Sequence, residues 1–84
     1  MFIHICLPGN LDKYDGQYEV DSNQLWNSFL KAVIKGDYHF LFDINEQPKP
    51  YIAIYLNKQK LLTLNDLKCV DNDTLMIISA TSGG

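Results

Sequence analysis

The fold is decided by the stretch Asp71-Asn72-Asp73-Thr74-Leu75-Met76-Ile77-Ile78-Ser79-Ala80-Thr81-Ser82-Gly83-Gly84. Residues 71–73 are of types that hydrogen-bond their own backbone and tolerate left-handed geometry, which predicts a turn. Residues 74–78 are β-branched or apolar throughout, which predicts a strand buried on at least part of both faces. The side chains then become small, and the stretch reaches two residues without side chains.

The pair Gly83-Gly84 has two interpretations. Chain ends are commonly disordered, and the pair would then have no function. Alternatively, the carboxylate of Gly84 is the functional group. A carboxylate that must enter a narrow cleft needs a thin, unbranched approach, and glycine permits close backbone contact that a Cβ would block. The position of the pair directly after an apolar strand favours this second interpretation.

Residues 51–84 resemble the C-terminal half of the ubiquitin-like sulfur-carrier proteins, such as the small subunit of molybdopterin synthase and the sulfur carrier of thiamine biosynthesis. The matching features are a strand ending at Leu56-Asn57, a polar turn at Lys58-Gln59, apolar residues at Leu61-Leu62 and 64–67, the pattern Asp71-x-Asp73, the final strand and Gly83-Gly84. The N-terminal half matches only in its pattern of two strands followed by a helix.

The resemblance implies an α+β fold of the β-grasp (ubiquitin-like) class. This fold is a mixed four- to five-stranded sheet with one main helix packed on one face. The first and last strands would lie side by side and run parallel. We therefore expect a single β-grasp domain over residues 1–80 and a flexible C-terminal tail over residues 81–84.

Size and charge limit the classes of function. Eighty-four residues suit one domain, and a formal net charge of −3 with scattered lysines argues against a nucleic-acid partner. There is no apolar run long enough to span a membrane and no signal peptide, so we expect a cytoplasmic protein without membrane contact.

The sequence contains no recognisable catalytic or metal-binding motif. Cys6 and Cys69 are far apart in the sequence, and we expect both to be buried free thiols. His4 and His39 do not complete a metal-ligand cluster with them, so no metal site is expected. The chain would take part in chemistry as a substrate or carrier and not as an enzyme.

A helix is predicted after residue 20. Asp21 is a suitable N-cap, Gln24 would complete a capping box, and Val20 and Leu25 could form a hydrophobic staple. Gly36 is expected to end the helix. The apolar stripe of this helix comprises Leu25, Trp26, Phe29, Leu30, Val33 and Ile34.

Strands are predicted at residues 2–7, 17–20 and 51–57, with a short edge at 60–62 and a single helical turn at 63–67. In the segment 37–50, His39-Phe40-Leu41-Phe42 is either a short strand or an apolar stretch folded under the sheet edge.

The final strand places alternate side chains on opposite faces of the sheet. The resemblance implies that Leu75 and Ile77 face the core beneath the helix. Met76 and Ile78 would then face outward and form a docking patch for a partner. The alternative is that the segment 37–50 covers them.

The resemblance also implies a mechanism. A partner enzyme of the ubiquitin-activating type would use ATP to adenylate the carboxylate of Gly84. A sulfur donor on that enzyme would then convert it to a thiocarboxylate, which donates sulfur in cofactor biosynthesis. This chain would bind no cofactor stably and would contribute the tail Thr81-Ser82-Gly83-Gly84 and the docking surface.

Within the family, the chain length favours the small subunit of molybdopterin synthase, which implies a larger catalytic subunit as a second partner. Two departures stand against this choice. Ser79-Ala80 replaces the proline found there in many such subunits, and Pro8-Gly9-Asn10 replaces an Arg-rich turn.

Other functions remain open. A carrier for thiamine, cysteine or transfer-RNA thiolation would carry the same tail. A ubiquitin-like modifier that forms isopeptide bonds would use the same Gly83-Gly84. The third possibility is a β-grasp interaction module whose tail is inert.

Overall fold

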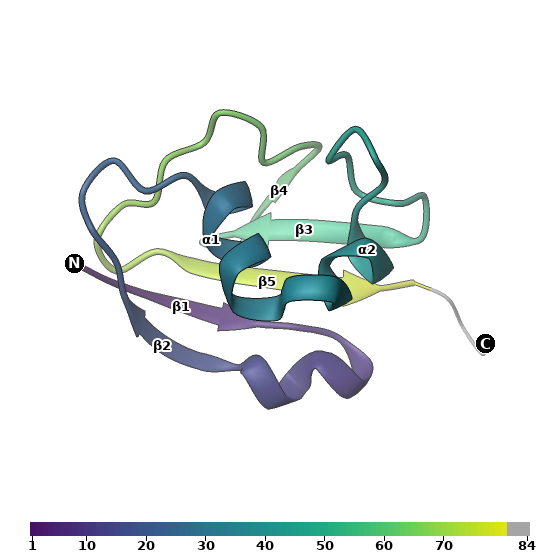
Figure 1. The fold of residues 1–84 in the computed structure, drawn as a ribbon, viewed down its shortest axis with the longest axis horizontal. Helices are drawn as coiled ribbons and strands as arrows, with labels where there is room; N and C mark the ends of the chain where they lie inside the picture. Colours follow the sequence, from purple (N-terminus) through teal and green to yellow (C-terminus); the bar gives the residue numbers. More distant parts are fainter. Residues whose placement is uncertain (81–84) are drawn as a thin grey trace.

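The computed structural model describes residues 1–80, which form a five-stranded sheet in the order β2-β1-β5-β3-β4 (Figure 1). The strands are β1 (Phe2–Cys6), β2 (Gly16–Glu19), β3 (Ile52–Leu56), β4 (Gln59–Leu61) and β5 (Thr74–Ser79). The helices are α1 (Trp26–Ile34) and the short α2 (Tyr38–Leu41), with the 3-10 helices η1 (Gly9–Tyr14) and η2 (Lys35–Asp37).

Strand β5 lies in the middle of the sheet. It pairs in parallel with β1, with Ile5 opposite Leu75, and antiparallel with β3, with Ile54 opposite Ile77. The first and last strands are therefore neighbours that run parallel, as expected. The mixed sheet has β2 and β4 at its edges.

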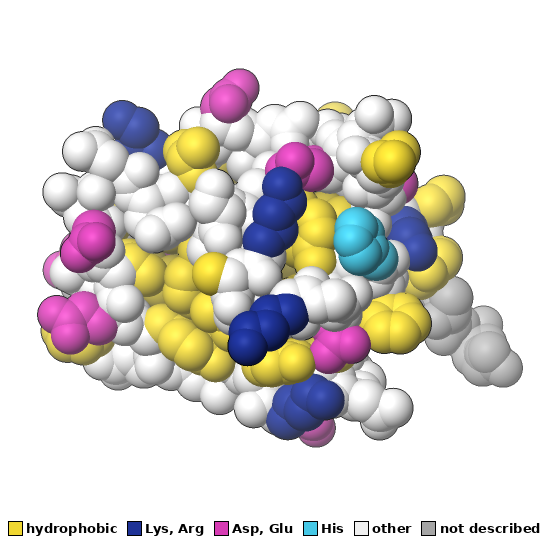
Figure 2. Space-filling view, in the orientation of Figure 1, with side chains coloured by type: hydrophobic (Ala, Val, Ile, Leu, Met, Phe, Trp, Pro, Cys, Tyr) yellow, Lys and Arg dark blue, Asp and Glu magenta, His cyan; other side chains and the backbone are white. Residues whose placement is uncertain are grey.

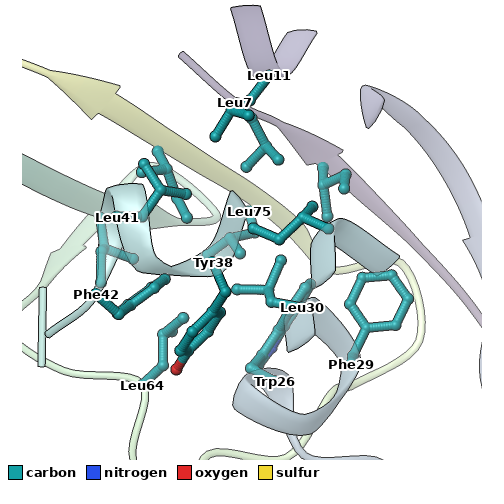
Figure 3. Packing of buried hydrophobic residues seen from close by; sticks show 14 of the residues in the cluster. Leu7, Leu11, Trp26, Phe29, Leu30, Tyr38, Leu41, Phe42, Leu64 and Leu75 are labelled. Atoms are coloured by element: carbon teal, nitrogen blue, oxygen red, sulfur yellow. The ribbon is translucent and has the colours of Figure 1, made fainter. Parts of the chain in front are cut away.

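The core lies between the sheet and the helices, which cover one face (Figure 1). Leu75 and Ile77 are 0% and 1% exposed, which confirms that they face the core. Figure 3 shows side chains of α1, such as Trp26 and Leu30, on the same side as Leu75.

Helix α1 begins later than predicted, so the prediction of Asp21 as the N-cap is wrong. The N-cap residue is Leu25, and within residues 1–80 it has no side-chain cap hydrogen bond. Asn23 has a positive φ of 72°, which ends any helical geometry after Asp21. The predicted capping box and staple are therefore absent from the described structure.

Hydrogen bonds to a distant segment explain the late start. The carbonyl of Gln24 accepts a hydrogen bond from the N–H of Cys69 (2.7 Å), and the N–H of Trp26 donates to the carbonyl of Leu67 (2.9 Å). These bonds hold residues 24–26 against residues 67–69. The N–H of Trp26, which has no partner within the helix, thus donates a hydrogen bond to a backbone carbonyl from elsewhere in the chain.

Helix α1 ends at Ile34, two residues before the glycine that was expected to end it. Lys35, and not Gly36, is the C-cap residue, with a φ of 51°. Its N–H still bonds the carbonyl of Lys31. Gly36 lies inside η2, which leads directly into α2.

The segment 37–50 contains a helix where a strand or a buried apolar stretch was expected. The strand alternative is wrong. Tyr38, Leu41 and Phe42 are buried in the core, with the rings of Tyr38 and Phe42 stacked 4.6 Å apart between centroids (Figure 3). The segment 37–50 therefore packs on the helical side of the sheet.

The helical turn predicted at 63–67 is also wrong, because residues 63–67 bend at Asp66, whose φ is 61°.

The two cysteines differ in burial. Cys69 is 4% exposed, as expected, whereas Cys6 is exposed, so its predicted burial is wrong. Cys6 follows the buried Ile5 on β1, and alternate side chains on a strand point to opposite faces. Its side chain therefore lies on the face of the sheet that the helices do not cover.

Candidate functional site

Strand β5 fixes the point from which the last four residues depart. Its backbone is paired as far as Ser79, which lies opposite Ile52. The N–H of Ala80 then donates a hydrogen bond to the carbonyl of Tyr51 (2.7 Å). The chain is thus held to the sheet through residue 80. The predicted site residues Thr81, Ser82, Gly83 and Gly84, and the predicted flexibility of this tail, lie outside the described residues.

The start of β5 is held by the acidic turn. Oδ1 of Asp71 accepts a hydrogen bond from the N–H of Phe2 (2.8 Å), and Asn72 has the predicted left-handed geometry, with a φ of 72°. The carbonyl of Asp73 accepts a hydrogen bond from the N–H of His4 (2.8 Å). The turn therefore attaches β1 to β5, and its carboxylates serve the fold.

Met76 and Ile78 are 41% and 40% exposed on the face opposite the helices. Residues paired across strands share a face of the sheet. Met76 lies opposite Cys6 on β1 and Tyr55 on β3, and Ile78 lies opposite Ala53. We call these five residues the open sheet face. The segment 37–50 does not cover it, because its buried residues belong to the core on the other side.

A groove of about 480 Å³ lies where β5 ends. Residues 8–13 form one side, α2 forms another, and the start of β3 and Ser79 complete it. Its lining includes Pro8, Leu11, Lys13, Phe40, Tyr51 and Ser79, and we call it the tail-root groove. Figure 2 shows hydrophobic side chains gathered at the right-hand end of the molecule, beside the position of α2 in Figure 1.

Sequence reasoning missed this groove. Its lining comes from segments far apart in the sequence, so spacing could not have shown it. One signal was present. In a helix over residues 38–42, burial of Tyr38, Leu41 and Phe42 turns Phe40 toward solvent. Phe40 is in fact 64% exposed.

The thiols are weak nucleophiles at neutral pH. Burial, followed by the charge of Asp73, raises the pKa of Cys69 to about 11. Burial and then Asp15 raise the pKa of Cys6. A thiol with a raised pKa stays protonated at neutral pH and reacts slowly.

Residues 1–80 contain no group of three or more His, Cys, Asp or Glu side chains arranged to hold a metal ion. In the same described part of the chain, no helix has the length and apolar character needed to cross a membrane.

The fold is the ubiquitin-like β-grasp. It is similar to the crystal structure of SAMP1 from Haloferax volcanii, with a TM-score of 0.70, 14% sequence identity and complete coverage of both chains. It is also similar to Urm1 from Sulfolobus solfataricus, with a TM-score of 0.60 and 23% identity over 89% of this chain and 96% of that one. No protein-family profile and no curated protein matches the sequence.

Proposed function

We propose that this chain is a ubiquitin-like sulfur carrier in which the carboxylate of Gly84 is the reacting group. The observation that supports this most directly is the placement of β5. Its inward residues, Leu75 and Ile77, are buried at the centre of the core, and its backbone is hydrogen-bonded through Ala80. Three residues, 81–83, then lead to Gly84.

The likeness to SAMP1 and Urm1 supports the same class of function, because these are ubiquitin-like proteins of the sulfur-carrier and modifier class. Proteins of this class generally act with adenylating enzymes of the ubiquitin-activating type. We propose such an enzyme as the first partner. The protein would act in the cytoplasm, and ATP and the sulfur donor would bind the enzyme and not this chain.

The chemistry begins with activation of a poor electrophile. A terminal carboxylate has a pKa of about 3.5 and is ionised at neutral pH. Its attack on the α-phosphorus of ATP would release pyrophosphate and form an acyl-adenylate. The outer sulfur of a persulfide would then attack the acyl carbon and expel AMP. A thiol would reduce the resulting acyl disulfide, leaving the Gly84 thiocarboxylate and a new disulfide.

The open sheet face is the proposed docking surface of this carrier. Met76 and Ile78 are apolar and exposed on an uncovered sheet. Burying them against a partner would remove apolar surface from water, which is the main favourable term in association. They would hold the partner while the tail reaches its active site.

Within this class we propose the small subunit of molybdopterin synthase, with a larger catalytic subunit as acceptor of the tail. Chain length supports this choice. The absence of proline at Ser79-Ala80 leaves carriers for thiamine, cysteine or transfer-RNA thiolation as the alternatives.

Intact-mass measurement tests the carrier function. The chain, ending at Gly84, is incubated with ATP, a sulfur donor and an adenylating enzyme encoded in the same genome. We expect a gain equal to the exchange of one oxygen for sulfur. A variant that lacks Gly84 should keep the same circular dichroism spectrum and show no gain. An unchanged mass with an enzyme that forms AMP from this chain would contradict the carrier proposal.

The second candidate is a ubiquitin-like protein modifier. The same placement of β5 supports it, as does the likeness to SAMP1 and Urm1. Conjugates that are larger than the free chain and that survive denaturant and thiol would favour this function. A carrier would leave no such conjugates.

A further inference from the structure

We infer that the tail-root groove is a recognition site for the adenylating enzyme, and that one apolar side chain of that enzyme occupies it. This inference rests on the proposed function, because it concerns the enzyme that acts on Gly84. The groove would be a second contact surface for the enzyme, separate from the open sheet face.

Chain length requires the enzyme to approach this end of the molecule. Residues 81–84 are the only covalent connection between Ala80 and the reacting carboxyl group. A fully extended chain spans at most about 3.5 Å per residue, so Gly84 reaches about 14 Å from Ala80. Ser79 lines the groove, and so does Tyr51, whose carbonyl accepts the hydrogen bond from Ala80. An active site that holds Gly84 must therefore lie within about 14 Å of Ala80, the residue that follows Ser79 of the groove lining.

The lining of the groove selects an apolar group. Leu11 and Leu41 are 8% and 2% exposed and provide a firm apolar floor, because they belong to the core. The exposed ring of Phe40 forms a wall that can close on an inserted side chain. Apolar or aromatic side chains that fill such pockets commonly dominate the energy of a protein interface.

The charged groups of the groove already have partners. Nζ of Lys13 lies 4.0 Å from Oδ2 of Asp37, and the hydroxyl of Tyr14 donates a hydrogen bond to the same oxygen (2.9 Å). The two charges of the rim thus offset each other. A charged occupant would have no unpaired opposite charge to meet there, which favours an uncharged apolar side chain.

Phe40 suits a direct test because its loss should leave the fold intact. The ring is 64% exposed, whereas its neighbours Tyr38 and Leu41 form the core side of α2. Ile44 offers a matched control in the same segment, since it is 92% exposed and does not line the groove. Met76→Ala reports separately on the open sheet face.

The experiment measures the Kd between the full chain and each adenylating enzyme encoded in the same genome, by titration calorimetry with purified proteins. Pyrophosphate exchange is measured in parallel. We expect Phe40→Ala to weaken binding about tenfold or more, equivalent to about 1.4 kcal/mol. Phe40→Leu should retain most of the affinity, and Ile44→Ala should match the wild type. In exchange assays Phe40→Ala should raise KM and leave kcat unchanged, because the Phe40 ring would contribute to binding and takes no part in the chemistry at the carboxyl group of Gly84.

The outcomes separate the two proposals. If the wild type binds and supports exchange while Phe40→Ala binds equally well, the groove inference is overturned and the carrier function stands. If the wild type binds but supports no exchange, while Phe40→Ala still binds more weakly, the groove inference stands and the function fails. If the wild type binds none of these enzymes, both are overturned.

Discussion

The side-chain amide of Asn57 donates a hydrogen bond to Oδ1 of Asp73 across 2.9 Å, which connects the end of β3 to the start of β5. The carbonyl oxygen of the same side chain accepts a hydrogen bond from the N–H of Thr74 (2.9 Å). Asp73 is only 5% exposed, and its Oδ2 accepts a hydrogen bond from the N–H of Val70 (2.9 Å). This carboxylate therefore needs both of its oxygens as acceptors.

Asp73→Asn should destabilise the fold, because the amide nitrogen introduces a donor where a donor already points. Hydrogen bonds to charged groups contribute about 1.5–3 kcal/mol, and we expect a loss of that size in the free energy of unfolding. Urea denaturation measures it. Asp12→Asn, at an exposed site, serves as the control and should change stability by less than about 0.5 kcal/mol. Equal stabilities of the two variants would contradict this account of the turn.

Truncation of two neighbouring residues on β5 should affect different properties: stability for Leu75 and partner binding for Met76. Leu75→Ala removes a side chain with no exposure and should cost about 2–5 kcal/mol of stability. Met76→Ala removes an exposed side chain and should cost less than about 1 kcal/mol, yet it should weaken binding to the adenylating enzyme. Thermal unfolding and titration calorimetry on both variants check the two effects. A stable Leu75→Ala variant would argue against the assigned core.

Asp21→Ala should leave stability within about 0.5 kcal/mol of the wild type. A true N-cap aspartate would cost about 1 kcal/mol on the same substitution. The small effect follows from the start of α1 at Trp26, where the N–H is satisfied by Leu67. Urea denaturation distinguishes the two values, and a loss near 1 kcal/mol would restore Asp21 as a capping residue.

Tyr38 should make the fold sensitive to alkaline pH. Burial, followed by the charges of Glu46 and Asp43, raises the pKa of Tyr38 from 10 to about 12. Between these values the folded state holds the phenol proton and the unfolded state does not, so stability is complete below pH 10 and falls as pH rises toward 12. Tyr38→Phe should make this decline shallower.

At neutral pH, Tyr38→Phe should cost about 1 kcal/mol, because the hydrogen bond from its hydroxyl to Oδ1 of Asn27 (3.2 Å) is lost. The pKa of Cys69 is also raised, to about 11, so the Cys69 thiol also lowers stability as the pH rises. This contribution is the same in the wild type and in Tyr38→Phe, and it cancels when the two are compared. Tyr51→Phe, at a tyrosine that is exposed, is the matched control. An alkaline decline as steep in Tyr38→Phe as in the wild type would disprove the assignment.

Sequence patterns predicted those parts of the fold that depend on neighbours along the chain. Alternation on the last strand placed Leu75 and Met76 on opposite faces of the sheet, the family resemblance indicated that Leu75 is the inward one, and the helical stripe placed Trp26 and Leu30 in the core. Such periodicity follows from local geometry alone. The turn at residues 71–73 was predictable for the same reason.

Features that depend on distant partners were not predictable from these patterns. The start of α1 is set by the bond between Gln24 and Cys69, which lie far apart in the sequence. The tail-root groove likewise combines residues 8–13 with Phe40 and Ser79. Spacing along one segment carries no information about which distant segment will lie beside it.

The central position of β5 has a consequence for synthesis on the ribosome. Of the strands in residues 1–80, β5 is the last to be made, yet it lies between β1 and β3. Until it emerges, these two strands have unpaired inner edges, which are prone to pair with other chains. Its inward side chains, Leu75 and Ile77, are also missing from the core until then. Nascent chains should therefore remain unfolded and susceptible to protease until β5 has emerged from the ribosome, and the fold should then form in one cooperative step.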